Sequence, residues 1–532
     1  MTENKSELKK QNFLTGAMII AVMNIIVKVI GALFKIPLNR ILEAGGMGIY
    51  TASYTIYNLL FVVATAGLPV AISRMVSESV TKQNYKEVHA IYKTASRLLL
   101  IVGIAGGLIL LLGGGVFAKA VGSESSALAI RALAPCLFFV AIMSVYRGMF
   151  QGTGNMVPTA VSEFVEAVGK LILGLVLAYT FLPMGKKYGA AGAILGVSAG
   201  AMLGAVYLVC CYRKTNKMIK EKANQQSDDQ AVNSKRLRKR LLLLAIPITI
   251  GSAVFTLASF IDLAMIMNQL KGLGFGLKER EELWGLYSGH AVTLFNLPPT
   301  IITALSISIV PAVTSAITAN QPQKARATIE TAIRITSLIA LPCAIGMSVL
   351  SKPILQVVMG KGDAASMLTV LAIGVVFVTV VMVSNAILQS YGKVWKPVIH
   401  MLIGGAVKVI VNFILVGNPD INIQGAPYGT VLCYITVAML NLITLHKLAR
   451  PNYGVGFVIK TVIATAAMGV AAYFVYGALC AKFGTTVALA ASICVAGVCY
   501  LVLLLVLRAL KKQDMEMMPG SKYILKYIGR FM

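Results

Sequence analysis

Residues 12–38 read NFLTGAMIIAVMNIIVKVIGALFKIPL, an apolar run long enough to cross a bilayer as one helix. Two lysines interrupt it, and a charged side chain near the bilayer centre costs at least about 2.5 kcal/mol on insertion scales. Asn24, Lys28, Gly31 and Lys35 are spaced by four, three and four residues, which places them on one helical face. The stripe predicts a membrane cavity that receives an anionic ligand. In the alternative interpretation, one or both lysines extend to the membrane interface.

The composition of the whole chain indicates a membrane protein. Of its 532 residues, 57% are hydrophobic and 13% are charged, and the mean hydropathy is +0.79. These values lie outside the range of soluble globular domains. Apolar runs and their breaks predict about fourteen transmembrane helices between residues 13 and 510. The predicted fold class is therefore an all-α polytopic membrane protein. The N-terminal tail is polar and lacks a small-residue cleavage site, so we expect the first helix to be retained.

Basic residues give the chain a formal net charge of +28, and their distribution predicts topology rather than nucleic-acid binding. If the N-terminus is inside, they concentrate on loops that face the cytoplasm, as the positive-inside rule requires. The basic segments are residues 74–97, 213–240 and 511–530. We expect a multi-pass protein of the cytoplasmic membrane with both termini in the cytoplasm. Its basic segments would lie against anionic membrane lipids.

No catalytic or cofactor-binding pattern stands out in the sequence. The eight cysteines lie in apolar runs without a CxxC pair, and the four histidines form no metal-binding motif. The nucleotide-binding pattern GxxxxGK[ST] does not occur. The sequence therefore predicts a transporter rather than an enzyme, with no metal and no cofactor. Membrane potential, H⁺ or Na⁺ would supply the energy.

Five short patterns recur in the same order at nearly one offset, which predicts an internal repeat. They are LPVAIS (68–73) with VPAVTS (310–315), KTASR (93–97) with ETAIR (330–334), FQG (150–152) with LQS (388–390), VGK (168–170) with AVK (406–408), and GA (189–190) with GA (425–426). Each repeat contains six predicted helices, so both halves enter the membrane from the same side. Parallel repeats of this kind place the substrate site between the halves.

The repeat predicts the domain organisation. We expect an N-terminal lobe at 1–212, a basic cytoplasmic linker at 213–240 and a C-terminal lobe at 241–450. Two further helices would occupy 451–510, and a basic cytoplasmic tail 511–532. The thirteenth and fourteenth helices fall outside the repeat, and we expect a monomer.

Several motifs resemble the MurJ and SpoVB branch, from Gram-positive bacteria, of the multidrug/oligosaccharidyl-lipid/polysaccharide exporter superfamily. They are KVIG (28–31), IPL (36–38), GLPVAIS (67–73), RGMFQG (147–152), MVPTAVSE (156–163), NLP (296–298) and VPA (310–312). The resemblance covers essentially the whole chain. It implies a two-lobed, fourteen-helix flippase that moves an undecaprenyl-pyrophosphate-linked precursor, most often lipid II of peptidoglycan biosynthesis, from the inner to the outer leaflet. Such flippases serve cell wall biogenesis and cell shape.

The same resemblance implies positions for the pyrophosphate site. Lys28 matches a basic position of the family on the first helix, and Lys35 matches a second one, with Asn24 on the same face. A lysine offers a phosphate a compact point charge. Lys170 on the fifth predicted helix has two interpretations: an ion pair with Glu166 at i,i+4, which we favour, or a contact with the substrate. The chain departs from the Gram-negative pattern at NLLF (58–61) and YSGH (287–290), and His290 would supply weak positive character there.

Asp262 is the lone acid of a long apolar run. The resemblance implies a sodium site at this aspartate in some relatives, completed from the eleventh and twelfth helices. Here Lys408 stands where a partner from the eleventh helix is expected, with Asn412 one turn further on. We therefore predict an Asp262–Lys408 pair in place of a bound sodium ion. Arg131 and Arg147 are interpreted as interface anchors.

Three alternative functions compete with a lipid II flippase. A flippase for another lipid-linked glycan, such as a capsule, teichoic acid or spore-cortex precursor, fits the same features. A drug or cation antiporter of the same superfamily would carry acids in its N-terminal cavity, which the lysine stripe disfavours. A membrane enzyme would carry a large outer loop with a catalytic constellation. In the favoured mechanism the two lobes rock about the headgroup while the lipid tail lies in a groove along the thirteenth and fourteenth helices.

Overall fold

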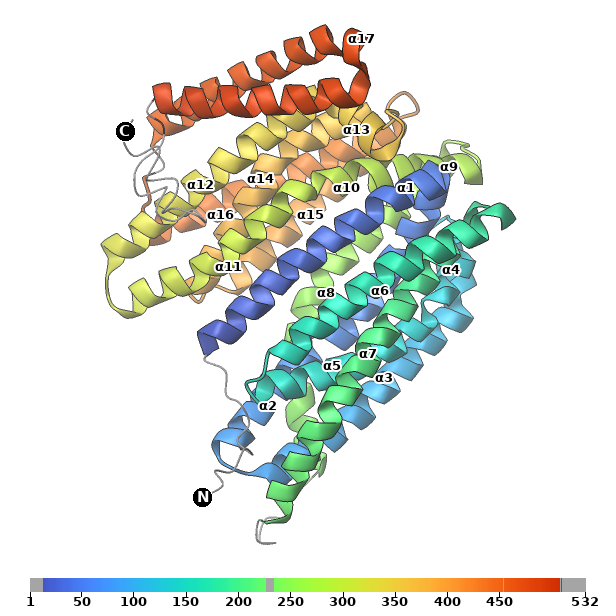
Figure 1. The fold of residues 1–532 in the computed structure, drawn as a ribbon, viewed down its shortest axis with the longest axis vertical. Coiled ribbons are helices and arrows are strands. Elements are labelled where there is room, and N and C mark those ends of the chain that lie inside the picture. Colours follow the sequence, from blue (N-terminus) through green and yellow to red (C-terminus); the bar gives the residue numbers. More distant parts are fainter. Residues whose placement is uncertain (1–12, 226–233, 453, 508, 510–532) are drawn as a thin grey trace. The chain divides into compact units, whose positions relative to one another are not determined.

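The computed structural model describes residues 13–225, 234–452, 454–507 and 509, and in these ranges the regular secondary structure is entirely helical (Figure 1). This confirms the predicted all-α class. The chain divides into two compact units, residues 1–285 and 286–532. Helix α8 thus groups with the first unit, whereas the sequence assigned residues from 241 onward to the second lobe. The lobe boundaries drawn from the repeat stay a prediction.

The described residues of the first unit form nine α-helices. They are α1 (Phe13–Thr65), α2 (Gly67–Thr81), α3 (Tyr85–Ala120), α4 (Ala127–Ala132), α5 (Ala134–Gly152), α6 (Val157–Phe181), α7 (Lys186–Asn224), α8 (Ser234–Gly272) and α9 (Leu277–Trp284), with 3₁₀ turns at Glu124–Ser126 and Leu182–Met184.

The second unit begins within a π-helical segment at Gly285–Ala291. Its helices are α10 (Val292–Phe295), α11 (Leu297–Thr318), α12 (Pro322–Val349), α13 (Ser351–Met359), α14 (Ala365–Ser390), α15 (Trp395–Val416), α16 (Ala426–Ala449) and α17 (Val455–Val506), with a 3₁₀ turn at Asn422–Gly425. One buried core joins α11, α12, α14 and α16 around Ile302, Ile329 and Ile387. A second core packs α17 onto α12 and α13.

Two long helices are interrupted at one residue each. Glu43 breaks α1 with φ 54° and ψ −173°, and Gly484 breaks α17 with φ 76° and ψ 167°. Glycine adopts positive φ without strain, whereas glutamate does not. The Glu43 carboxylate is held by the Lys186 ammonium at 2.7 Å. Each break reverses the chain, so α1 and α17 each supply two of the predicted membrane crossings.

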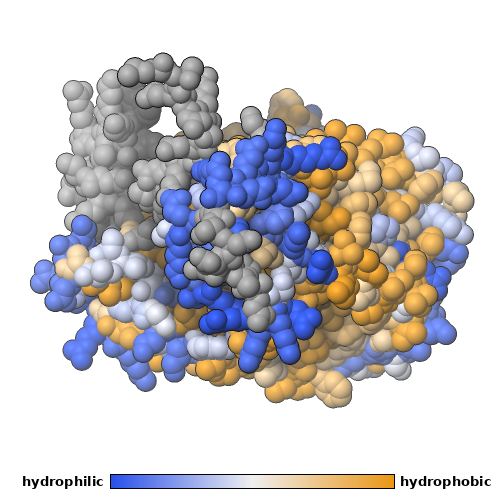
Figure 2. Space-filling view, turned by 90° about the horizontal axis from the view of Figure 1, so that it is seen from below, coloured by the Kyte–Doolittle hydropathy of each residue, from blue (hydrophilic) through white to orange (hydrophobic). Residues whose placement is uncertain are grey.

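Ten helical runs in the described ranges are long and apolar enough to span a membrane. Their outward faces are hydrophobic: Leu112, Val116 and Phe474 expose 76%, 70% and 68% of their surface. Figure 2 shows hydrophobic side chains over a broad flank of one face, beside a separate hydrophilic area. Apolar patches of this size mark contact with lipid or protein. The chain is therefore a multi-pass membrane protein.

Helices α6 and α7 pack unusually closely because glycines line their interface. A Cβ added to Gly196 would lie 2.2 Å from the Cα of Gly174, and one added to Gly200 would lie 2.6 Å from the Glu166 carbonyl oxygen. Small residues let membrane helices approach in this way. The backbone of α6 is thereby fixed at the turn that carries Glu166 and Lys170.

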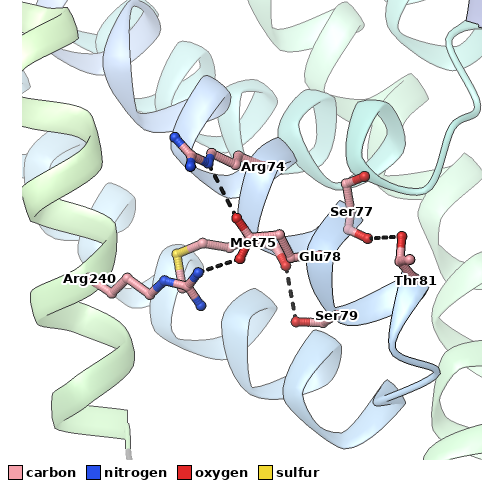
Figure 3. Close-up of polar contacts among 7 residues, drawn as sticks. All are labelled: Arg74, Met75, Ser77, Glu78, Ser79, Thr81 and Arg240. Atoms are coloured by element: carbon pink, nitrogen blue, oxygen red, sulfur yellow. Dashed lines mark hydrogen bonds and ion pairs between the residues drawn. The ribbon is translucent and has the colours of Figure 1, made fainter.

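The start of α8 is attached to α2 by a shared carboxylate. Glu78 of α2 accepts from Arg74 at 3.3 Å and from Arg240 of α8 (Figure 3). These side chains remain partly exposed, so this contact orients the helices more than it stabilises them.

Candidate functional site

A cavity of about 180 Å³ lies inside the first unit, between both halves of α1, α6 and α7. Aromatic side chains form much of its wall, and three charged groups of α6 lie along it. The aromatic residues are Phe34, Tyr54, Tyr57 and Phe61, and the charged residues are Glu163, Glu166 and Lys170. The cavity therefore combines apolar faces with both signs of charge inside a membrane-spanning unit.

Lys170 is held by aromatic rings. Its Nζ lies 5.0 Å from the centre of the Phe34 ring and 4.9 Å from that of Tyr54. A cation over the face of an aromatic ring is attracted by the ring quadrupole. No carboxylate pairs with Lys170 in the described part of the chain, so its positive charge is not neutralised.

The predicted Glu166–Lys170 ion pair is wrong. Glu166 Oε2 instead accepts from Arg147 Nη2 of α5 at 2.9 Å, and Arg147 Nε donates to Ser162 Oγ at 3.1 Å. Arg147 is consequently a structural cation between α5 and α6, not an interface anchor. The planar guanidinium reaches two acceptors at once, an advantage that an ammonium lacks.

Glu163 is the second acid of the cavity. Its Oε2 is buried and has no hydrogen-bond partner among the residues that the structure describes. A buried carboxylate oxygen without a partner carries a desolvation cost. The acid is therefore a group whose protonation or ligation would stabilise the unit.

The stripe on α1 borders this cavity. Gly31 lines it, and Lys35 is half-buried and close enough to Lys170 to be repelled by it. Lys28 is exposed and Asn24 half-buried on the same helical face. The structure thus brings Lys35 and Lys170 together. The roles of Lys28, Lys35 and Asn24 in binding stay predictions.

The remaining predicted site residues are spread over both units. Asp262 is buried on α8 of the first unit, whereas Lys408 is half-buried on α15 of the second. Their pairing stays a prediction. Asn412 is fully buried on α15 where Gly429 of α16 approaches it. The side of α15 that carries Asn412 is therefore a helix-packing face.

His290 occupies the π-helical segment at the start of the second unit. Only 1% of its surface is exposed, and within the described ranges neither ring nitrogen has a hydrogen-bond partner. π-Helical turns are frequent at functional positions. Its contribution to a pyrophosphate site stays a prediction.

Sequence reasoning missed two features. The first is the aromatic lining of the cavity: Tyr54, Tyr57 and Phe61 line it, and together with Tyr50 they repeat the spacing of the lysine stripe. A buried polar network in the second unit was not visible: His400 Nδ1 lies 2.7 Å from Asn441 Oδ1, and Asn441 Nδ2 donates to Ser384 Oγ at 2.8 Å. Side chains from three helices are in contact there, and the spacing of residues along the sequence does not predict contacts between separate helices.

Comparison with known proteins identifies the family. Residues 13–318 match the family described as "Polysaccharide biosynthesis protein", and residues 289–414 match the family "MatE". The chain is 26% identical to stage V sporulation protein B of Bacillus subtilis (strain 168), over 96% of this chain and 98% of that protein. It is 25% identical to lipid II flippase MurJ of the same organism, over 86% and 87%.

Two solved structures have the same fold. Lipid II flippase MurJ in an inward closed conformation matches with a TM-score of 0.62 at 14% identity, over 92% of this chain and 97% of that one. An inward-facing multidrug resistance MATE family transporter matches with a TM-score of 0.61 at 15% identity, over 81% and 98%. The chain belongs to the polysaccharide biosynthesis protein family, within the multidrug/oligosaccharidyl-lipid/polysaccharide exporter superfamily. It is a membrane transporter, not an enzyme.

Proposed function

We propose that the chain is a flippase that moves an undecaprenyl-pyrophosphate-linked glycan, with lipid II as the first substrate to test, from the inner to the outer leaflet. One observation carries this proposal: Lys170 holds an un-neutralised charge on aromatic rings in a membrane-embedded cavity, and Lys35 is near enough to be repelled by it. A pyrophosphate is an anion that would neutralise such a group. The tyrosine faces suit the sugar rings beside it.

The proposed mechanism is alternating access. About 180 Å³ is less than the 300–1,000 Å³ of ordinary ligand pockets, so a glycan headgroup requires this cavity to widen. In the proposed cycle Lys28, Lys35 and Lys170 receive the pyrophosphate in the inward-open state. The lipid tail stays in the bilayer beside α17, whose halves are the proposed thirteenth and fourteenth helices.

The membrane potential supplies a direct driving force. In the cytoplasmic membrane, with the termini inside, a pyrophosphate moves from the negative to the positive side. Each charge that crosses gains about 2.3 kcal/mol per 100 mV. Coupling to H⁺ or Na⁺, at Asp262 or elsewhere, would add to the free energy that the membrane potential supplies.

Complementation tests the proposal. The gene should rescue a bacterium depleted of its lipid II flippase, and Lys28→Ala should abolish rescue while the protein persists in the membrane. Lys271→Ala is a matched control, because it removes an exposed lysine from the end of α8, away from the cavity. Undiminished rescue after removal of both Lys28 and Lys35 would contradict the pyrophosphate assignment.

A related lipid-linked glycan is the second candidate substrate. The similarity to stage V sporulation protein B, which spans nearly both chains, supports it. Rescue of a sporulation mutant that lacks that protein, without rescue of the flippase-depleted strain, would favour a spore-specific substrate.

A cation or drug antiporter is the third candidate, supported by the two acids of the cavity. Glu163 and Glu166 are the kind of groups that such a transporter uses, although Glu166 is paired with Arg147. Ethidium efflux from proteoliposomes under a proton gradient would favour this function. An efflux that survives Glu163→Gln would count against it.

A further inference from the structure

A second and larger cavity, of about 650 Å³, lies at one end of the first unit. It is lined by residues from the break in α1, the start of α7 and helix α9, and α9 packs against α1. Its charged lining consists of Lys186, Lys187, Lys278, Glu281 and Glu282. None of these residues belongs to the membrane cavity described above.

Helix α9 forms a rigid wall of this cavity. A Cβ on Gly48 would lie 1.8 Å from the Glu281 carbonyl oxygen, and one on Gly285 would lie 1.7 Å from that of Ala44. The buried Arg280 donates to the Gly122 carbonyl at 2.9 Å, and Ser123 Oγ donates to Glu281 Oε1 at 2.9 Å. Both the backbone and the buried side chains of α9 are therefore fixed, and its outer face presents Lys278 and Glu282 to the cavity.

Some charged groups of the cavity already have a bonding partner, whereas others do not. Lys186 is paired with Glu43 at 2.7 Å, and Glu281 is bonded to Ser123. Lys187 lies over the Tyr188 ring at 5.0 Å, and neither it nor Lys278 has a carboxylate partner within the described ranges. Two ammonium groups thus remain for an anion. The Glu282 carboxylate and the Ser125 hydroxyl beside them accept and donate hydrogen bonds, as sugar hydroxyls require.

We propose that this cavity is a second binding site, for a phosphorylated sugar. Lys187 and Lys278 contact the phosphate, and Glu282 contacts hydroxyl groups. Its volume lies within the range of ordinary ligand pockets.

The position of the cavity suggests when it is used. Lys186 and Lys222 stand at opposite ends of α7, a helix of 39 residues, which separates them by about 55 Å at 1.5 Å per residue. The cavity therefore lies at the end of the unit remote from its basic segments. If the proposed function holds, this is the outer side, and the site receives the phosphorylated headgroup after it has crossed.

Binding is measured on the purified full-length chain in nanodiscs of neutral phosphatidylcholine. Trp284 of α9 and Trp395 are the two tryptophans, so Trp395→Phe leaves a single reporter beside the cavity. The probes are N-acetylglucosamine 1-phosphate, inorganic phosphate and N-acetylglucosamine. We expect saturable binding of the sugar phosphate, weaker binding of phosphate and none of the free sugar.

Paired variants make the test specific. Lys187→Ala/Lys278→Ala should weaken sugar-phosphate binding about tenfold or more. The control Lys119→Ala/Lys271→Ala removes two exposed lysines from the same end, at the ends of α3 and α8, and should change binding less than about twofold. Equal losses in both pairs, or no saturable binding, would overturn the proposal. Phosphate that binds as tightly as the sugar phosphate would overturn the headgroup assignment. Because binding is read without transport, a failure here is distinct from a failure of complementation.

Discussion

Replacing Arg147 by methionine is expected to destabilise the first unit. The Arg147 guanidinium contacts Glu166 Oε2 at 2.9 Å and Ser162 Oγ at 3.1 Å, which joins α5 to α6. Methionine keeps much of the apolar length of the side chain and removes its charge. The change therefore leaves the Glu166 carboxylate in place without its cation.

The burial of the pair sets the size of the effect. Removing one partner from a fully buried ion pair costs about 3–5 kcal/mol, whereas an exposed pair is worth about 0–1 kcal/mol. The Arg147 and Glu166 side chains are 18% and 27% exposed, so this pair lies between the two limits. We expect Arg147→Met to lower the free energy of unfolding by about 2 kcal/mol. Glu166→Gln should cost less, because its amide oxygen still accepts from the guanidinium.

Equilibrium unfolding of the purified chain in mixed detergent micelles measures these changes. In a double-mutant cycle, Arg147→Met/Glu166→Gln should show a coupling energy of about 1–2 kcal/mol. Arg74→Met is the matched control: its pair with Glu78 has side chains 66% and 34% exposed, so we expect a loss below about 0.5 kcal/mol. Additive losses in the cycle, or equal losses at Arg147 and Arg74, would refute the reasoning.

Three further predictions concern other residues of the first unit. Lys170→Gln should abolish rescue of a flippase-depleted strain at an unchanged protein level in immunoblots, since an amide leaves the phosphate without its cation; full rescue would contradict the assignment. Gly196→Ala should lower stability by about 1–3 kcal/mol, because its Cβ would lie 2.2 Å from Gly174 Cα; an unchanged melting temperature would show that α6 and α7 can separate. Burial raises the pKa of the Glu281 carboxyl above its usual 4.5. The folded state therefore holds this proton more tightly, and the associated stability is complete below pH 4.5 and lost as the pH rises through the folded-state pKa. Glu281→Gln should flatten that decline in a melting series, and a parallel decline would count against it.

The helices and the cationic character of the first unit could be predicted, because both depend on local pattern. Apolar runs of sufficient length predict membrane helices whatever they pack against. The spacing of Lys28 and Lys35 likewise fixes their common face. The apolar runs predict a break of α1 between residues 38 and 47, but not the residue at which it falls, since Glu43 adopts positive φ although it is not a glycine.

The partners of the buried charges could not be predicted, because they depend on which helices meet. Glu166 has a lysine four residues away on its own helix, and local spacing favours that pair. The packing of the helices produces a different pair. Helix α6 contacts α7 through glycines, and α5 lies where Arg147 reaches Glu166. A long-range ion pair of this kind leaves no periodic signal in one sequence.

Because Glu166 pairs with Arg147 and not with Lys170, a cation remains in the cavity. Had Glu166 paired with Lys170, both charges would have been neutralised, and the cavity would offer an anion little. With Arg147 on Glu166, the rings of Phe34 and Tyr54 stabilise the Lys170 ammonium, and no carboxylate in the described ranges pairs with it. Such a contact is worth about 0.5–2 kcal/mol, well below the cost of burying an isolated charge. Under the proposed function this difference would favour binding of a phosphate, and the ion pair between α5 and α6 would keep Lys170 available for it.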